Sequence, residues 1–140
     1  MRAKEFLWQL KDVNNLIDTY DEEYKRLIDK ATSTSSKMSD VVIRSGNKSS
    51  KQEIVCADLV ELAEKVDKEK RRLADIEEKA LDVIGQLNPL KLQTVLIKYY
   101  IQNKTFEQTA VEMDRTYRWV CELHGQALNA FDEVTGGDIK

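Results

Sequence analysis

The feature that most constrains the fold is a pair of heptad repeats. Over residues 3–31 and 52–87, apolar side chains recur at alternating steps of four and three residues, so that each segment has one apolar stripe. The second stripe contains one charged exception, Glu69. The first stripe is Phe6, Leu10, Val13, Ile17, Tyr20, Tyr24, Leu27 and Ala31, and the second is Val55, Leu59, Leu62, Val66, Glu69, Leu73, Ile76, Ala80, Val83 and Leu87. This period is typical of helices that supercoil around a partner. The sequence therefore predicts an all-α chain whose residues 1–88 form a long antiparallel coiled-coil hairpin.

Composition supports the helical class and bears on the compartment. With 5 Gly and 1 Pro in 140 residues, the chain has few breakers, which argues against an all-β sandwich or barrel. No apolar run approaches the roughly 18 residues that span a bilayer, and the start of the chain lacks the apolar region of a signal peptide. Cys56 and Cys121 are far apart and have no partner at metal-ligand spacing. We therefore expect a cytoplasmic protein that makes no membrane contact.

A polar, basic segment separates the two repeats. Residues 32–51 contain four basic residues and one acidic residue, and they are rich in Ser and Thr. Because Ser, Thr, Gly and Asn side chains compete with the helix backbone for hydrogen bonds, the segment predicts a loop.

The remaining chain shows start and stop signals for shorter helices. Asn88-Pro89 is typical of an Asn cap followed by Pro at the first helical position, and apolar residues then recur at helical spacing up to residue 101. Thr105 and Gln108 have the spacing of a capping box, which predicts a short second helix. We expect Ala110 to lie where this helix crosses the next one.

A tight turn and a longer helix follow. Asp114-Arg115-Thr116 predicts a turn in which Thr116 caps a helix running from Tyr117 to about residue 131. A short capped helix, a three-residue turn and a longer helix together predict a helix-turn-helix domain over residues 89–134. Residues 135–140 are then a tail.

The sequence gives no sign of an enzyme. No acidic residue stands with His or Cys at a catalytic or metal-ligand spacing, and no glycine-rich phosphate loop is present. His124 is the single histidine and lies beside an apolar stripe, where a packed and hydrogen-bonded role is the common one. We therefore expect no catalytic residue, no cofactor and no bound metal.

Two segments of this region carry a resemblance to a known family. Residues 99–110, YYIQNKTFEQTA, resemble the entry to the promoter-reading region of bacterial sigma factors, and residues 113–128 resemble the helix that follows it. The whole chain also resembles small, mostly uncharacterised phage and prophage proteins of Gram-positive bacteria, through residues 31–33, 44–47 and 123–125 as well. That family is similar to phage late-gene activators. The resemblance implies DNA-linked transcription regulation in the bacterial host cytosol.

In such a domain the last helix reads the major groove, while the helix starts contact phosphates. The DNA-binding residues expected here are Lys104, Thr105, Arg115, Thr116, Tyr117, Arg118, Trp119, Glu122 and Gln126. Residues 89–140 contain six basic and seven acidic residues, a poor balance for a DNA binder. The expected partner is double-stranded DNA. Strong binding to it would therefore need a homodimer, the basic loop or a protein partner such as RNA polymerase.

Several of these residues have structural alternatives. Arg118 and Glu122 are spaced for a surface ion pair, and Trp119 can pack against the first helix of its domain. Gly125 within a helix indicates the close approach of a neighbouring backbone or of DNA. At the level of function, the alternatives are a protein that docks on RNA polymerase or another regulator without reading DNA, and a DNA-packaging subunit of small-terminase type.

Overall fold

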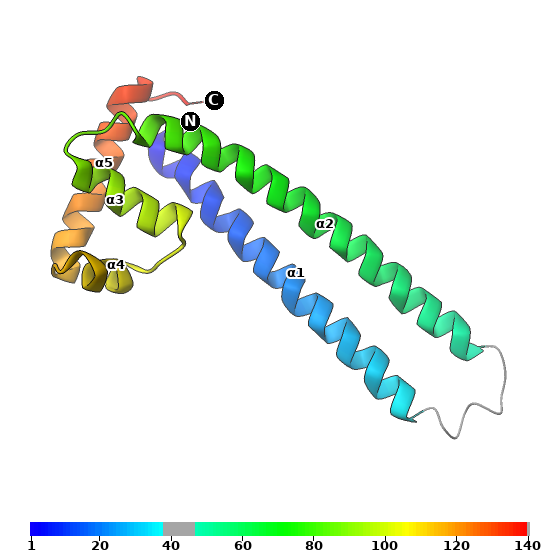
Figure 1. Ribbon diagram of the computed structural model, residues 1–140. Coiled ribbons are helices and arrows are strands. Elements are labelled where there is room, and N and C mark those ends of the chain that lie inside the picture. The colour runs from blue at the N-terminus through cyan, green and yellow to red at the C-terminus, as the bar shows by residue number, and fades with distance from the viewer. Residues whose placement is uncertain (38–46, 140) are drawn as a thin grey trace. The chain divides into compact units, whose positions relative to one another are not determined.

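Every regular element that the structure describes is a helix (Figure 1). The computed structural model describes residues 1–37 and 47–139, with side chains for 1–32 and 53–139. In chain order the elements are α1 (Ala3–Lys37), α2 (Asn47–Ile84), α3 (Leu90–Leu96), the π-helical turn η3 (Ile97–Ile101), α4 (Phe106–Met113) and α5 (Tyr117–Thr135). The predicted all-α class is confirmed for this part of the chain.

The chain forms two compact units that differ from a simple division along the sequence. The terminal unit comprises Met1–Asn14 and Arg72–Lys140, and the middle unit comprises Asn15–Arg71. The start of α1 and the end of α2 thus belong to the same unit as α3, α4 and α5. The boundary predicted after residue 88, between the hairpin and the helix-turn-helix domain, was drawn from the sequence pattern and stays a prediction.

The terminal unit is built around one apolar core. Fully buried large side chains come from α1, from the end of α2 and the turn after it, and from each later helix: Leu7, Leu10, Ile84, Leu87, Val95, Leu96, Tyr100, Thr109, Val120 and Phe131. The start of α1 is fixed to α5, since the Asp132 carboxylate accepts a hydrogen bond from the Ala3 backbone N–H at 2.8 Å. The Phe6 and Phe131 rings lie 6.2 Å apart, so the same two helices also share apolar contact.

The turn between α2 and α3 differs from the predicted one. Helix α2 ends at Ile84 rather than at residue 87, and the N-cap of α3 is Pro89, without a side-chain cap bond, so the predicted Asn88 cap is wrong. A cis peptide bond joins Asn88 to Pro89. The Gln93 side-chain amide donates to the carbonyl of Leu87 at 2.9 Å, so α3 itself satisfies the backbone of the turn.

The predicted loop is shorter than expected at both ends. Helix α1 continues to Lys37 and α2 begins at Asn47, so the helix ends predicted at residues 31 and 52 are wrong; residues 38–46 of the predicted loop lie outside the described residues. The Thr32 hydroxyl donates to the Ile28 carbonyl at 2.9 Å. A hydroxyl that donates to the preceding turn is compatible with a helical backbone, so Thr32 does not end α1.

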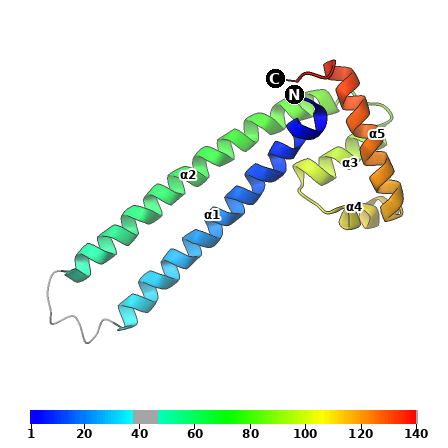
Figure 2. The same cartoon turned by 180° about the vertical axis from the view of Figure 1, so that it is seen from behind.

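In its described residues, the middle unit consists of parts of α1 and α2. These two segments run side by side in opposite directions in both views (Figures 1 and 2). Ile17 and Leu62 of the predicted stripes are buried, whereas Tyr24 is 38% exposed. The other described stripe positions of this unit are half-buried. A pair of helices can cover one stripe on each partner, and the rest of each helix stays in contact with water.

Candidate nucleic-acid interface

Helix α4 begins and ends at well-defined caps. The Thr105 hydroxyl accepts from the Gln108 backbone N–H at 3.1 Å, and the Gln108 side-chain oxygen accepts from the Thr105 N–H at 2.9 Å. This is the capping box that the sequence predicted. At the other end Asp114 adopts the left-handed conformation, with φ of 55°, and stops the helix.

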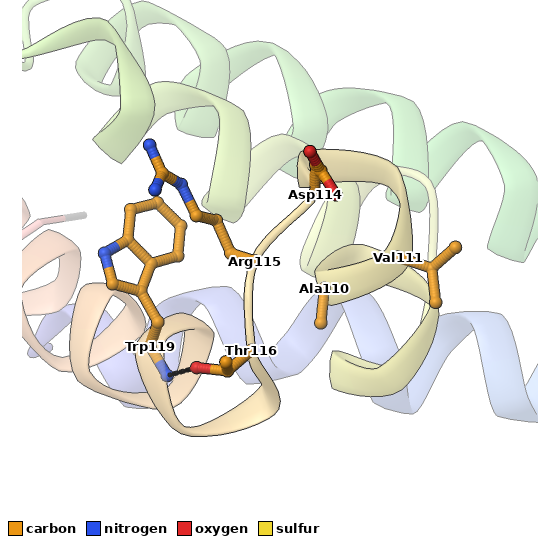
Figure 3. A pocket seen from close by; sticks show the side chains of 6 residues that line it. All are labelled: Ala110, Val111, Asp114, Arg115, Thr116 and Trp119. Atoms are coloured by element: carbon orange, nitrogen blue, oxygen red, sulfur yellow. Dashed lines mark hydrogen bonds between the residues drawn. The ribbon is translucent and has the colours of Figure 1, made fainter.

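The next three residues place α5 directly after α4. The Arg115 backbone N–H donates to the Ala110 carbonyl at 2.9 Å, which closes the turn. The Thr116 hydroxyl accepts from the Trp119 N–H at 3.1 Å, so the predicted cap of α5 is confirmed (Figure 3). Ala110 is buried, as expected for a small residue where two helices come close. Helix α5 ends at Thr135, four residues beyond the predicted end, because Gly136 adopts the left-handed conformation there.

The first turns of α5 present an exposed edge. Tyr117 is 50% exposed, and the side chains of Arg118 and Glu122 are 90% and 62% exposed. Gln126 is exposed one turn further along. A Cβ atom added at Gly125 would meet no atom within 4 Å beyond its two chain neighbours and the nearby backbone of its own helix. The expectation that Gly125 admits a neighbouring backbone of the same chain is therefore wrong for this fold, and an external partner remains the alternative.

Acidic side chains accompany the cations of this region. The Arg118 Nε lies 3.4 Å from the Glu122 carboxylate, as the ion-pair alternative predicts. The Lys104 and Lys98 ammonium groups lie 2.5 and 2.7 Å from the same Glu112 oxygen. Hydrogen bonds from Lys104 and then Lys98 lower the pKa of the Glu112 carboxyl, so its charge persists at neutral pH. These pairs leave few uncompensated charges beside the start of α5.

Trp119 lies beside the turn, and two cationic side chains lie over its ring. It is half-buried, with the Arg115 guanidinium carbon 5.0 Å and the Lys91 ammonium 5.8 Å from the ring centroid. Since Lys91 belongs to α3, this is the packing that the structural alternative for Trp119 predicted. Figure 3 shows the pocket of about 610 Å³ next to this ring, which is lined by Ala110, Val111, Asp114, Arg115, Thr116 and Trp119.

An aromatic cluster packs against α5 through Tyr117 and His124. In the π-helical turn η3 the consecutive residues Tyr99 and Tyr100 both contact the His124 ring, at centroid distances of 5.3 and 5.6 Å. Phe106 stacks on Tyr99 at 4.1 Å and meets Tyr117 edge-on at 6.1 Å. The cluster therefore connects η3, the start of α4 and the start of α5. Because its rings come from η3, α4 and α5, the periodicity within one helix could not predict this cluster.

His124 is a packed residue of this cluster. Its Nε2 lies 2.7 Å from the Tyr100 hydroxyl. Burial, together with the smaller effect of the charges of Lys4 and Lys11, lowers the pKa of His124 to about 4. The expected packed and hydrogen-bonded role is confirmed, and the imidazole is neutral at pH 7.

The structure thus distributes the predicted DNA-binding residues over three places. Arg115, Thr116 and Trp119 line the pocket beside the turn, while Lys104 and Thr105 line a second pocket at the start of α4. The exposed edge of α5 holds the remaining four: Tyr117, Arg118, Glu122 and Gln126. The second pocket also contains Lys11 of α1, which sequence reasoning missed because it is distant in the chain.

Comparison of the chain with protein-family models, with curated proteins and with solved structures finds no match. The resemblance to the sigma-factor region therefore depends on residues 99–110 and 113–128 themselves.

Two further searches cover the described part of the chain, residues 1–37 and 47–139. Within it, no group of three or more His, Cys, Asp or Glu side chains is placed to hold a metal ion. No helix within the same ranges is both long and apolar enough to cross a bilayer.

Proposed function

We propose that the protein is a phage- or prophage-encoded DNA-binding transcription regulator in which α4 and α5 act as a sigma-like helix-turn-helix. The observation that carries this proposal is the corner of α4, a three-residue turn and α5, with the first turns of α5 exposed. In this arrangement α5 enters the major groove, where each base pair presents a distinct pattern of donors and acceptors. The site is non-catalytic: its function is to recognise DNA.

Within this proposal the exposed edge of α5 reads the bases. Arg118 is 90% exposed and can donate to a guanine, and Tyr117 offers a ring of which half is exposed. Glu122, the ion-pair partner of Arg118, can accept a hydrogen bond from a cytosine amino group. Arg115 and the caps at Thr105 and Thr116 lie at the helix starts, next to where phosphates would pass. The ion pair between Arg118 and Glu122 must open for both residues to contact bases.

The proposal includes dimerisation through the middle unit as a coiled-coil hairpin. Its stripe residues are mostly half-buried in one chain, and Tyr24 and Ile28 are 38% and 40% exposed. A second copy would cover this apolar surface and bring two α5 edges to one DNA molecule. Two linked sites gain affinity without new contacts, which offsets the weak charge of each.

The direct experiment is an Arg118→Ala substitution measured by gel shift on a DNA site selected by the wild-type protein. We expect specific binding to weaken by about 1–3 kcal/mol, since a base contact is lost, while the melting temperature stays unchanged. Lys25→Ala is the charge-matched control, because Lys25 is exposed on the middle unit. Unchanged affinity of the Arg118→Ala variant would show that this side chain on the exposed edge of α5 does not contact DNA bases.

One observation favours a second candidate, a protein that docks on RNA polymerase or another regulator. Val111 is 80% exposed and lines the pocket beside Trp119, which gives α4 an apolar surface. Two results together would establish this function instead. The wild type would show no DNA binding at low salt, and the Val111→Ser variant would lose the RNA polymerase that the wild type captures in a pull-down.

A further inference from the structure

A pocket of about 360 Å³ lies where the start of α1 meets the start of α4. It is lined by Lys11, Tyr99, Asn103, Lys104, Thr105, Phe106 and Glu107. All of these residues belong to the terminal unit, so the pocket is part of one compact body. Its wall at Phe106 also contacts the ring of Tyr117, the first residue of α5, at 6.1 Å. The pocket, called here the Lys11 pocket, therefore adjoins the proposed reading edge.

Lys11 is held in this pocket by neutral groups. Its ammonium lies 3.7 Å from the centroid of the Tyr99 ring and 3.3 Å from the side-chain oxygen of Asn103. Asn103 has a φ of 55°, a left-handed conformation that Asn tolerates better than most residues. Among the described residues no carboxylate pairs with Lys11. Burial lowers its pKa, as expected for a cation that has lost water without gaining an acidic partner.

The other charges around the pocket cancel, so its positive excess is the charge of Lys11 itself. Lys104 shares the single carboxylate of Glu112 with Lys98, so two ammonium groups face one negative charge. Glu107 supplies an opposing carboxylate to the lining. Counting Lys11, these side chains still carry one positive charge more than negative charges. An anion in the pocket would restore the charge balance that Lys11 lacks.

We propose that the Lys11 pocket binds a phosphate group of the DNA backbone, with Lys11 as a contact from outside the helix-turn-helix segment. This inference rests on the proposed function, because the phosphate belongs to a duplex whose bases meet α5. Lysine is suited to this role as a compact charge with three N–H donors. Helix α1 would then take part in DNA binding as well as in the core.

The test is the salt dependence of DNA binding by the full-length Lys11→Met variant, measured by fluorescence anisotropy on a selected site and on random duplex. Met keeps the apolar stem and removes the charge. We expect affinity to fall about threefold to tenfold on both DNAs at low salt, and the slope of log K against log salt to become shallower by about 0.9. Lys11→Arg should keep the wild-type slope, and Lys25→Ala, exposed on the same helix, should change neither quantity.

The outcomes separate this inference from the proposed function. If the wild type binds DNA with a steep salt dependence and Lys11→Met binds identically, Lys11 makes no phosphate contact and only the inference fails. If the wild type does not bind DNA, both fail. Titration with inorganic phosphate, followed by amide chemical shifts at residues 103–107, distinguishes the source of the anion. Tight saturable binding of free phosphate without DNA binding would overturn the assignment to a DNA backbone. A melting curve checks that each variant is folded.

Discussion

The terminal and middle units contain the same kinds of residues but bury them to different degrees. In the described chain, buried hydrophobic residues of the middle unit are Ile17 and Leu62, whereas the terminal unit holds the rest of the core. Three helices and η3 surround the ends of α1 and α2 in the terminal unit, so a side chain there meets neighbours on several sides. The described residues of the middle unit form two helical segments, and each covers one stripe of the other. A heptad repeat thus predicts where a helix is apolar but not how completely it will be covered.

The largest expected effect tests this comparison with one aromatic residue from each unit. Phe131→Ala empties a site that is 0% exposed and should lower the free energy of unfolding by about 3–5 kcal/mol. Tyr24→Ala removes a ring that is 38% exposed and should cost below about 1 kcal/mol in dilute solution. Urea unfolding of both variants measures the difference. Equal costs at every protein concentration would contradict the contrast, whereas a cost for Tyr24→Ala that rises with concentration would support the proposed dimer.

A smaller effect concerns acid. The folded pKa of His124 is about 4, below the ordinary value of 6.5, so the unfolded chain binds more protons between these values. Its contribution to stability is therefore complete above pH 6.5, is lost progressively as the pH falls toward 4, and is absent below that. We expect a loss on the order of 1–2 kcal/mol, reduced for the exposed part of the ring.

Unfolding of the wild type and of His124→Gln between pH 7 and about 4.5 checks this contribution. The stability difference between the two proteins should shrink as the pH falls. Because His124 is the single histidine of the sequence and lies in the terminal unit, the effect assigns this sensitivity to that unit. A constant difference would show that the imidazole titrates alike in both states.

The smallest effect separates stability from binding within α5. Gly125 is exposed in the helix interior with open space around it, so Gly125→Ala should stabilise the protein by about 0.5–1 kcal/mol in thermal unfolding. If DNA approaches this point closely, the same methyl group should weaken DNA binding. Asn129→Ala, at another exposed position of α5, is the control and should leave DNA binding unchanged. A Gly125→Ala protein that is more stable and binds equally well would show that Gly125 does not contact DNA.

Local signals in the sequence predicted the later helices well. The Thr105 and Gln108 box, the Thr116 cap and the buried Ala110 each depend on residues a few positions apart, so a pattern of short range is sufficient. The Asn88 cap was wrong because α3 begins one residue later, with Pro89 at the cap, and the Gln93 amide donates to the Leu87 carbonyl of the turn. That arrangement leaves no signal at Asn88 itself.

The packing of α1 was beyond the reach of such patterns. Its heptad stripe continues without a break from Phe6 to Ala31, and nothing in the period distinguishes the part that meets α5 from the part in the middle unit. In the sequence, Lys11 lies between two stripe positions and has the pattern of an ordinary surface lysine. Its place over Tyr99 depends on contacts about ninety residues away, which only the fold brings together.

The central claim is that the terminal unit binds duplex DNA through the start of α5. The most direct measurement is the affinity of the full-length protein for DNA fragments taken from around its own gene, at low and moderate salt. We expect sequence-preferring complexes whose affinity falls linearly on a log–log plot as salt rises. Absence of any complex at low salt, with RNA polymerase still captured by the protein, would contradict this claim.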